Sequence, residues 1–173
     1  MNKKPRLWKT ISSKVVFDHE HLKIVEDKTK LPNGLEKDYV RLAPMQPDSV
    51  IVIAINTKNM VLIQKEYSYP PNKIMWQLPG GSRKTGESIK AAAKRELAEE
   101  SGYSAKNTQI LGYFYTMNRL SDQKQYVVLC TKLFKHSLGE DEDEFIETFW
   151  LSKKDLTSKI SNGEFDNINL LAA

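Results

Sequence analysis

Three acidic residues stand on a segment whose composition predicts a helix. The segment runs from Ser88 to Glu100 and contains no proline or interior glycine. At about 100° of rotation per residue, Glu96 and Glu100 fall within roughly 20° of Ile89. On the same wheel Glu99 lies about 80° away. These acids border the apolar side of the helix, where burial penalises an uncompensated charge. Carboxylate oxygens are also ligands that Mg²⁺ prefers.

Charge compensation on this helix is incomplete. The fixed cation close to the acids is Arg95, which could bond Glu87 or Glu99. An excess of acids over this arginine favours a divalent cation as the remaining positive charge. A second interpretation is that the acids form i,i+4 pairs with lysine and arginine on an ordinary surface helix. The helix alone does not decide between the two.

The elements around this helix predict a mixed α+β protein. Residues 14–17 and 22–26 predict a first hairpin, and the Asn33-Gly34 turn predicts a second that pairs 24–30 with 36–42. This region, residues 1–45, is poor in apolar residues of its own, so we expect it to pack on something else.

Residues 46–173 predict a larger domain. Apolar runs at 49–55 and 60–63 predict two core strands joined by a tight turn, whereas 67–72 is expected to be irregular. The remaining predicted elements are strands at 109–115, 125–133 and 145–151, a polar loop at 116–124, a helix opened by a capping box at Ser152 and a short helix at 166–171. Strands before and after one strong helix favour a sandwich in which helices cover a mixed sheet.

Composition restricts the classes of protein. The chain has 173 residues and 40% hydrophobic residues, enough for a stable core, and a single cysteine, Cys130, which rules out an internal disulfide or a cysteine metal cluster. No apolar run approaches the roughly 20 residues that span a membrane, and the N-terminus lacks an apolar signal segment. We therefore expect a cytoplasmic protein with no membrane partner. The basic N-terminus lacks a nucleic-acid-binding motif, so we expect it to be solvated.

The flanks of the helix carry a motif. The entry to the helix is glycine-rich, with Gly80-Gly81 and Thr85-Gly86. Around the helix the chain matches a motif of Gly, five residues, Glu, seven residues, Arg-Glu, an aliphatic residue, any residue, Glu-Glu, any residue and Gly. The matching residues are Gly81, Glu87, Arg95-Glu96-Leu97, Glu99-Glu100 and Gly102. This pattern resembles the Nudix box. It departs at Tyr103, where the family usually has an aliphatic residue.

The resemblance implies an α/β/α Nudix sandwich that uses Mg²⁺, or Mn²⁺, to hydrolyse a pyrophosphate linkage in a nucleoside diphosphate joined to another group. It also implies roles for individual residues. Glu96 and Glu100 would be the main metal ligands, with the Gly80 carbonyl as a backbone ligand. Glu99 would be a further or water-mediated ligand with a catalytic role. Glu87 would pair with Arg95 to hold the loop against the helix, and Gly102 would be a structural position.

Outside the box the chain is similar to the ADP-ribose and nucleotide-sugar pyrophosphatase branch. In that branch the N-terminal strands commonly exchange across a homodimer, so the resemblance implies a homodimer with 1–45 exchanged. Two positions depart from the branch. Ser68 stands where an arginine is often found, and 116–119 has no proline; Arg119 could supply a cation instead. A nucleoside diphosphate sugar is favoured, with ADP-ribose a leading candidate. A nucleoside triphosphate housecleaning pyrophosphatase and a nucleotide-binding regulator are alternatives.

The branch also implies a catalytic base on a late acidic loop, here residues 140–144. Counting back from Trp150 points to Glu142 as the base and to Glu144 as a metal-side carboxylate. A solvated acidic loop is the competing interpretation. For the substrate, Tyr67 or Tyr69 could stack on the nucleobase, and Gly81 lies where the backbone can approach the ligand.

Overall fold

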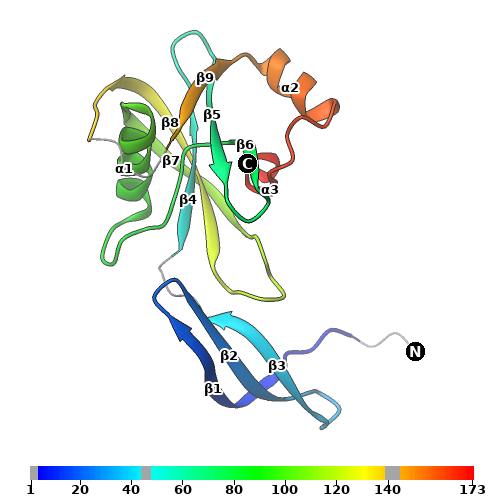
Figure 1. The fold of residues 1–173 in the computed structure, drawn as a ribbon. Helices are drawn as coiled ribbons and strands as arrows, with labels where there is room; N and C mark the ends of the chain where they lie inside the picture. The colour runs from blue at the N-terminus through cyan, green and yellow to red at the C-terminus, as the bar shows by residue number, and fades with distance from the viewer. Residues whose placement is uncertain (1–3, 44–47, 139–144) are drawn as a thin grey trace. The chain divides into compact units, whose positions relative to one another are not determined.

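The structure is a computed structural model that describes residues 4–43, 48–138 and 145–173. These residues form two compact units, whose elements are labelled in Figure 1. The first unit holds residues 1–45 together with 117–123, and the second holds 46–116 together with 124–173. The N-terminal region expected from the sequence ended at residue 45 and did not include 117–123.

The first unit is a three-stranded antiparallel sheet. Its strands, in the order β1-β2-β3, are β1 (Lys9–His19), β2 (Leu22–Lys30) and β3 (Glu36–Ala43). Lys30 pairs with Glu36 across the predicted turn, where Gly34 N–H donates to Leu31 O at 2.9 Å. Segment 117–123 joins β3 because Leu42 N–H donates to Leu120 O at 2.7 Å. Both predicted hairpins are therefore present.

One face of β2 carries an ion pair with a buried carboxylate. Val25, Asp27 and Thr29 alternate along the strand and are all buried. Asp27 accepts hydrogen bonds from Arg41 Nε at 2.5 Å and from the Ser13 hydroxyl at 2.6 Å. The bond from Arg41 lowers the pKa of Asp27, and the Ser13 bond acts in the same direction. This face is held by polar contacts more than by apolar packing.

The second unit contains two three-stranded sheets. One has the order β4-β8-β7 and the other β6-β5-β9. Their strands are β4 (Ser49–Ala54), β5 (Val61–Ser68), β6 (Lys73–Gln77), β7 (Tyr103–Tyr115), β8 (Lys124–Lys135) and β9 (Glu147–Leu151). β4 and β8 pair in parallel, whereas the other pairs are antiparallel. The two expected core strands β4 and β5 exist, but they belong to different sheets. Among the described residues an isolated bridge joins Ile55, the residue after β4, to Val61 of β5.

The described residues of this unit also form three helices, namely α1 (Ile89–Ser101), α2 (Lys153–Ser161) and α3 (Ile168–Ala172). Capping interactions mark the ends of α1 and α2. The Ser88 side chain accepts from Ala91 N–H at the start of α1, and Gly102 adopts a left-handed conformation at its end. Ser152 and Asp155 form a capping box at the start of α2. Within the described residues, no helix is long and apolar enough to cross a membrane.

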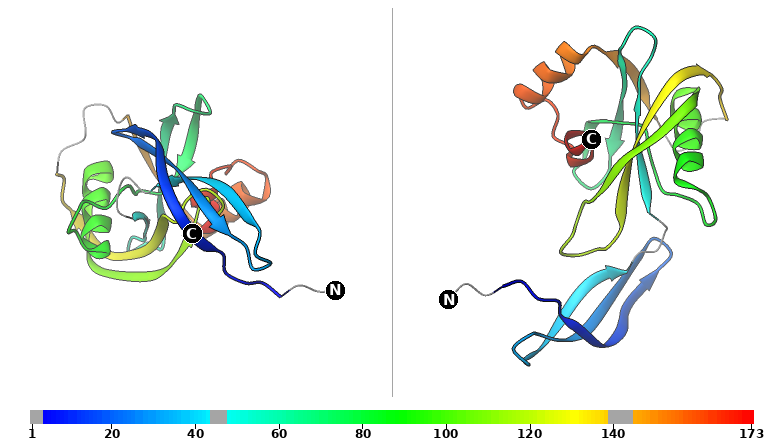
Figure 2. Two further views of the ribbon diagram at one scale, coloured as in Figure 1. Left: turned by 90° about the horizontal axis from the view of Figure 1, so that it is seen from below. Right: turned by 180° about the vertical axis from the view of Figure 1, so that it is seen from behind.

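The core of the second unit lies on both sides of β5. Leu62 packs into a cluster with Leu97 of α1 and Val128 of β8. The next residue, Ile63, packs with Phe165 and Leu170 on the side of α2 and α3. Helix α1 lies on one side of the strands, and α2 and α3 lie on the other, as the two views of Figure 2 show. This is the predicted α/β/α sandwich.

Candidate active site

The loop before α1 is held tightly against β4. Val52 N–H donates to Pro79 O at 2.7 Å, and Val50 N–H donates to Gly81 O at 2.9 Å. Gly80 has φ +156°, and a Cβ placed on it would lie 2.2 Å from the backbone oxygen of Val50. Because a backbone atom cannot move aside as a side chain can, only glycine fits at residue 80.

The same loop touches the acidic face of α1. A Cβ on Gly81 would meet the Glu96 carboxylate, with the two oxygens at 2.7 and 2.9 Å. Glu96 is itself buried, at 8% exposure. The missing side chain at Gly81 is therefore what gives the Glu96 carboxylate room beside the loop.

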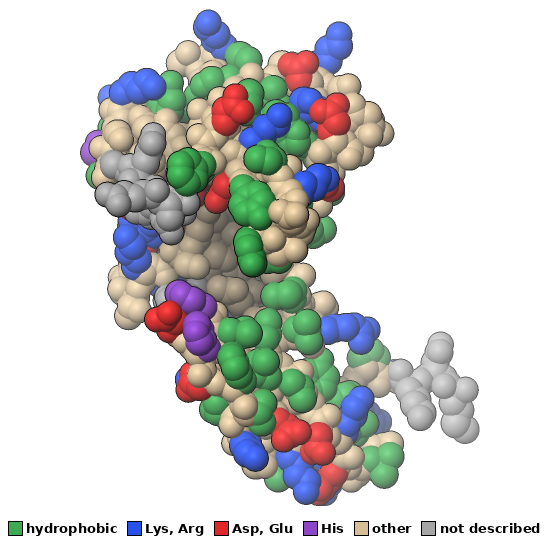
Figure 3. Space-filling model, in the orientation of Figure 1, with side chains coloured by type: hydrophobic (Ala, Val, Ile, Leu, Met, Phe, Trp, Pro, Cys, Tyr) green, Lys and Arg blue, Asp and Glu red, His purple; other side chains and the backbone are tan. Residues whose placement is uncertain are grey.

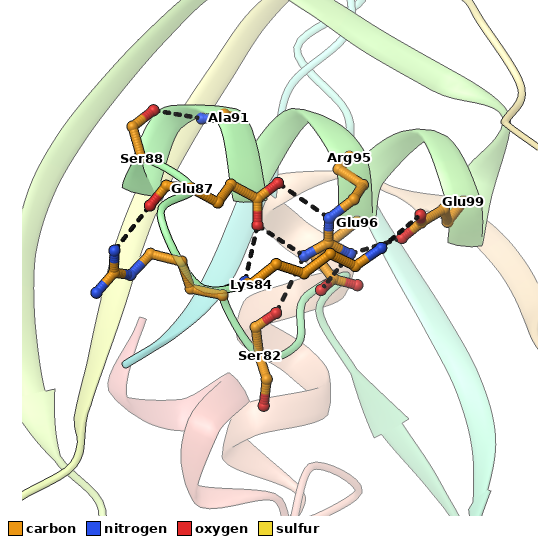
Figure 4. A network of polar contacts seen from close by, with 9 residues as sticks. Ser82, Lys84, Glu87, Ser88, Ala91, Arg95, Glu96 and Glu99 are labelled. Atoms are coloured by element: carbon orange, nitrogen blue, oxygen red, sulfur yellow. Dashed lines mark hydrogen bonds and ion pairs between the residues drawn. The ribbon is translucent and has the colours of Figure 1, made fainter. Parts of the chain in front are cut away.

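Arg95 connects this loop to the acids of the helix (Figure 4). Its Nε and Nη2 donate to the two oxygens of Glu87 at 3.0 and 3.1 Å. Its Nη1 lies 2.8 Å from Glu96 Oε1 and donates to Glu99 Oε2 at 2.7 Å. Nη2 also donates to Ser82 O at 3.0 Å. One guanidinium group thus holds three carboxylates and the loop backbone, a geometry that its planar fork suits.

Arg95 and Glu87 shift each other's pKa. The hydrogen bonds from Arg95 lower the pKa of Glu87, and the bonds to Glu87 raise the pKa of Arg95. Arg95 is only 14% exposed, so its ion pairs are poorly screened by solvent. Lys84 Nζ also lies 3.9 Å from Glu99 Oε1, but its side chain is 68% exposed. The three carboxylates still outnumber these two cations, so the cluster favours a further positive charge.

Glu100 is held separately from this cluster. Its Oε2 accepts from Gln64 Nε2 of β5 at 2.8 Å and from Gly80 N–H at 3.1 Å. The described residues include no three His, Cys, Asp or Glu side chains already grouped as a metal site. Glu96, Glu99 and Glu100 are brought to one side of α1, facing the loop and β5, but the first two are turned toward Arg95.

The predicted substrate-binding residues are more dispersed. Tyr67 is 47% exposed and its hydroxyl donates to Asn72 Oδ1 at 3.0 Å, while Tyr69 is 82% exposed at the following turn. Because side chains alternate along β5, Tyr67 points to the opposite face of the strand from Gln64. Arg119 belongs to the first unit, where its carbonyl accepts from the Tyr39 hydroxyl. Glu142 and Glu144 lie outside the described residues.

Gln64 is a residue at this site that the sequence analysis did not single out. The sequence signal was a polar amide directly after the apolar residues Leu62 and Ile63, and the structure shows that this amide is buried.

A comparison with known families agrees with this geometry. A family model described as the NUDIX domain matches residues 45–173, which is more than half of the chain. The chain belongs to the Nudix family. Its box residues are the ones that the structure gathers between the loop and α1, and family membership makes the chain a Nudix hydrolase.

Several relatives of this Nudix chain are known. An ADP-ribose pyrophosphatase from Bacillus subtilis is 28% identical over 158 residues, covering 90% of this chain and 84% of the relative. A methanol dehydrogenase activator from Bacillus methanolicus is 32% identical over 148 residues, covering 83% and 78%. The ADP compounds hydrolase NudE from Escherichia coli is 30% identical over 112 residues, covering 65% and 60%.

A solved structure supports the fold. The crystal structure of an ADP compounds hydrolase superposes with a TM-score of 0.89, covering 99% of this chain and 92% of that chain at 20% sequence identity. At this identity the likeness bears on the fold alone.

Proposed function

We propose that this Nudix hydrolase cleaves the pyrophosphate linkage of a nucleoside diphosphate sugar, with ADP-ribose as the leading candidate. The observation that carries the proposal is the clamp in which Arg95 and the Gly80-Gly81 loop hold Glu96, Glu99 and Glu100 on one side of α1. The names of two relatives, an ADP-ribose pyrophosphatase and an ADP compounds hydrolase, favour this substrate class.

The reaction consumes one water molecule. Its oxygen forms a bond to one phosphorus, and the bond from that phosphorus to the bridging oxygen breaks, so the second phosphate leaves. The water's protons pass to a base and to the solvent, and the products are a nucleoside monophosphate and a sugar phosphate. On this proposal Glu142 is the base, and Glu99 is a further carboxylate near the reacting water.

The residues fit a hard divalent cation. Carboxylates exceed the compensating guanidinium, and the absence of a Cβ at Gly81 lets the Glu96 carboxylate lie directly beside the loop. Mg²⁺, or Mn²⁺, would be held by Glu96, Glu99 and Glu100, with the Gly80 carbonyl and Glu144 as further oxygen donors. When bound, such a cation neutralises phosphate charge and activates water.

The remaining residues act on orientation in this proposal. Arg95 and Glu87 keep the loop against α1, so Gly80 and Gly81 stay aligned with the acids. Gly81 lets the backbone approach the diphosphate, and Tyr67 or Tyr69 stacks on the base.

We also propose a homodimer that covers β1. Every residue of this strand is exposed, and its apolar side chains Ile11, Val15, Val16 and Phe17 are 47–49% exposed. Figure 3 shows apolar side chains gathered over the sheet of the first unit. Strand exchange with a second copy would bury this surface. Light scattering at twice the mass of one chain is expected, whereas a monomer would contradict the dimer.

A reducing cytoplasm is the proposed location, since the only cysteine, Cys130, is a buried free thiol. Fractionation of cells that express the chain would test it.

A substrate panel tests the proposed reaction. The protein would be incubated with Mg²⁺ and ADP-ribose, other nucleotide sugars, dinucleoside polyphosphates and nucleoside triphosphates, and the products separated by ion-exchange chromatography. The proposal expects AMP and ribose 5-phosphate from ADP-ribose, with no products in excess EDTA. Release of inorganic pyrophosphate from triphosphates alone would favour the housecleaning alternative. Hydrolysis of no member would overturn the proposal.

A second candidate function is nucleotide-dependent regulation of another enzyme. The name of the Bacillus methanolicus relative, a methanol dehydrogenase activator, favours it. The test compares nucleotide binding and turnover in wild type and Glu100→Gln. A regulator would bind nucleotide in both forms and turn it over equally slowly in both. Under the main proposal wild type is fast and only the variant is slow.

A further inference from the structure

Gln64 occupies a position where an amide is out of place. It lies on β5, the central strand of the β6-β5-β9 sheet, and is 2% exposed. The two residues before it, Leu62 and Ile63, are buried in the apolar cores. Burying an amide among such residues is unfavourable unless its hydrogen bonds are made. Exceptions of this kind to the apolar pattern of a strand are expected at functional sites.

The amide nitrogen of Gln64 is committed to Glu100. Nε2 donates to Glu100 Oε2 at 2.8 Å, and Gly80 N–H donates to the same oxygen at 3.1 Å. An ionised carboxylate only accepts hydrogen bonds, so the NH₂ group of the amide must be the part that faces it. Strand β5 and the loop therefore fix one oxygen of Glu100 from two sides.

The amide oxygen of Gln64 has the opposite status. Oε1 is buried, and no hydrogen-bond partner for it exists among the described residues. A buried acceptor left in this state is destabilising, and such groups are few in native proteins. A water molecule brought to the site with a ligand would satisfy it.

The backbone around Gln64 is well placed to hold an orientation. Gln64 is paired with Gln77 of β6 on one side and with Thr148 of β9 on the other. A side chain on a central strand varies in position less than one on a loop. Among the described side chains Gln64 thus provides a rigid reference for a carboxylate on a different element, α1.

We propose that Gln64 is a positioning residue of the metal site: its Nε2 fixes the orientation of the Glu100 carboxylate, and its Oε1 accepts a hydrogen bond from water at the loaded site. The inference rests on the proposed function, because it assumes that Glu100 binds a divalent cation. It adds a residue outside the box, on β5, to the machinery of that site.

The test measures the affinity for Mn²⁺ by electron paramagnetic resonance, without substrate. Gln64→Met keeps the length of the side chain but removes the donor and the acceptor. Gln64→Asn keeps the amide but shortens its reach by about 1.5 Å, the length of one carbon–carbon bond. Gln77→Met is the matched control, because Gln77 faces Gln64 in register but donates to Glu66 instead of Glu100.

We expect the Kd for Mn²⁺ to rise about 10- to 100-fold in both Gln64 variants, the usual effect of losing a partner that orients a metal ligand. The Kd of the Gln77→Met variant for Mn²⁺ should stay within about twofold of the wild-type value, which is well below the effect of losing a residue that orients a metal ligand. The melting temperature of metal-free Gln64→Met should stay close to that of wild type, because removal of the unsatisfied acceptor offsets the loss of the hydrogen bond to Glu100. A purely structural glutamine would instead lower the melting temperature and leave the affinity unchanged.

The outcomes separate this inference from the function on which it rests. Tight Mn²⁺ binding by wild type with an unchanged Kd in Gln64→Met would overturn the positioning role and leave the proposed function standing. Absence of Mn²⁺ binding by wild type would overturn both. If Gln64→Met does not fold, Gln64→Asn decides, since it retains a polar amide at the site.

Discussion

Replacing Gly81 with alanine should damage catalysis while leaving the fold intact. The added Cβ would lie 2.7 Å from Glu96 Oε1, whereas ordinary contacts begin near 3.4 Å. The Glu96 carboxylate must therefore retreat by about 0.7 Å, the difference between these distances. Gly81 is not among the glycines with positive φ, so its backbone can accept alanine without strain.

The expected loss of activity follows from this displacement. A misplacement near 1 Å at a catalytic group can lower the rate by about 100-fold, so we expect kcat to fall roughly 10- to 100-fold. Stability should change little. Alanine restricts the unfolded chain and stabilises by about 0.4–1 kcal/mol, which offsets a weakened pair between Arg95 and Glu96.

The assay compares kcat for nucleotide-sugar hydrolysis with the free energy of unfolding in urea. Gly112→Ala is the control, because a Cβ there would meet nothing within 4 Å. We expect Gly112→Ala to keep its kcat within a small factor of wild type. A Gly81→Ala enzyme with wild-type kcat, or an equal loss in both variants, would refute the claim that the loop and Glu96 are closely fitted.

Three further predictions concern the buried charges and thiol. Arg95→Met should lower the free energy of unfolding by about 3 kcal/mol in EDTA urea melts, since it leaves buried carboxylates uncompensated, and Mg²⁺ should restore part of this loss. The lowered pKa of Glu87 implies stability that is present above its ordinary value of 4.5 and lost as the pH falls further, so the wild-type advantage over Glu87→Gln in melting temperature should shrink below that pH. Burial raises the pKa of Cys130 to about 11, so a thiol reagent at pH 8 should label it only as fast as the chain unfolds; rapid labelling of native protein would contradict its burial.

Local signals made the helix predictable. The composition of 88–100 and the glycine at 102 are short-range features, and the structure places α1 at Ile89–Ser101, with Ser88 as its N-cap and Gly102 after its end. The pairing of Glu87 with Arg95 was predicted from the box for the same reason, because only eight positions separate the two residues. Features that depend on residues close together in the sequence can be predicted without knowledge of the rest of the fold.

Long-range pairings were not predictable from the sequence. β4 pairs with β8, so that Val52 faces Val128, although the tight turn after β4 suggests β5 as its partner. Strand β6 follows the Pro70-Pro71 turn and is too short to show a pattern. These choices depend on how whole sheets pack, and no local residue determines them.

The contact between Gln64 and Glu100 belongs to the same class. The two residues are 36 positions apart and meet only because β5 and α1 pack against each other. The strand alternation that points Gln64 toward Glu100 also turns Tyr67 to the other face. The aromatic run alone does not indicate which face of β5 Tyr67 occupies, and its stacking role stays a proposal.

The most direct test of the central claim is a comparison of wild type with Glu100→Gln at saturating Mg²⁺. Single-turnover hydrolysis of ADP-ribose would be measured together with the dissociation constant of the substrate. Loss of a metal ligand should slow turnover by more than about 100-fold, which exceeds the effect of losing a residue that only orients such a ligand. Substrate binding should change little. Turnover within a few-fold of wild type would contradict the claim that the acids of α1 carry the reaction.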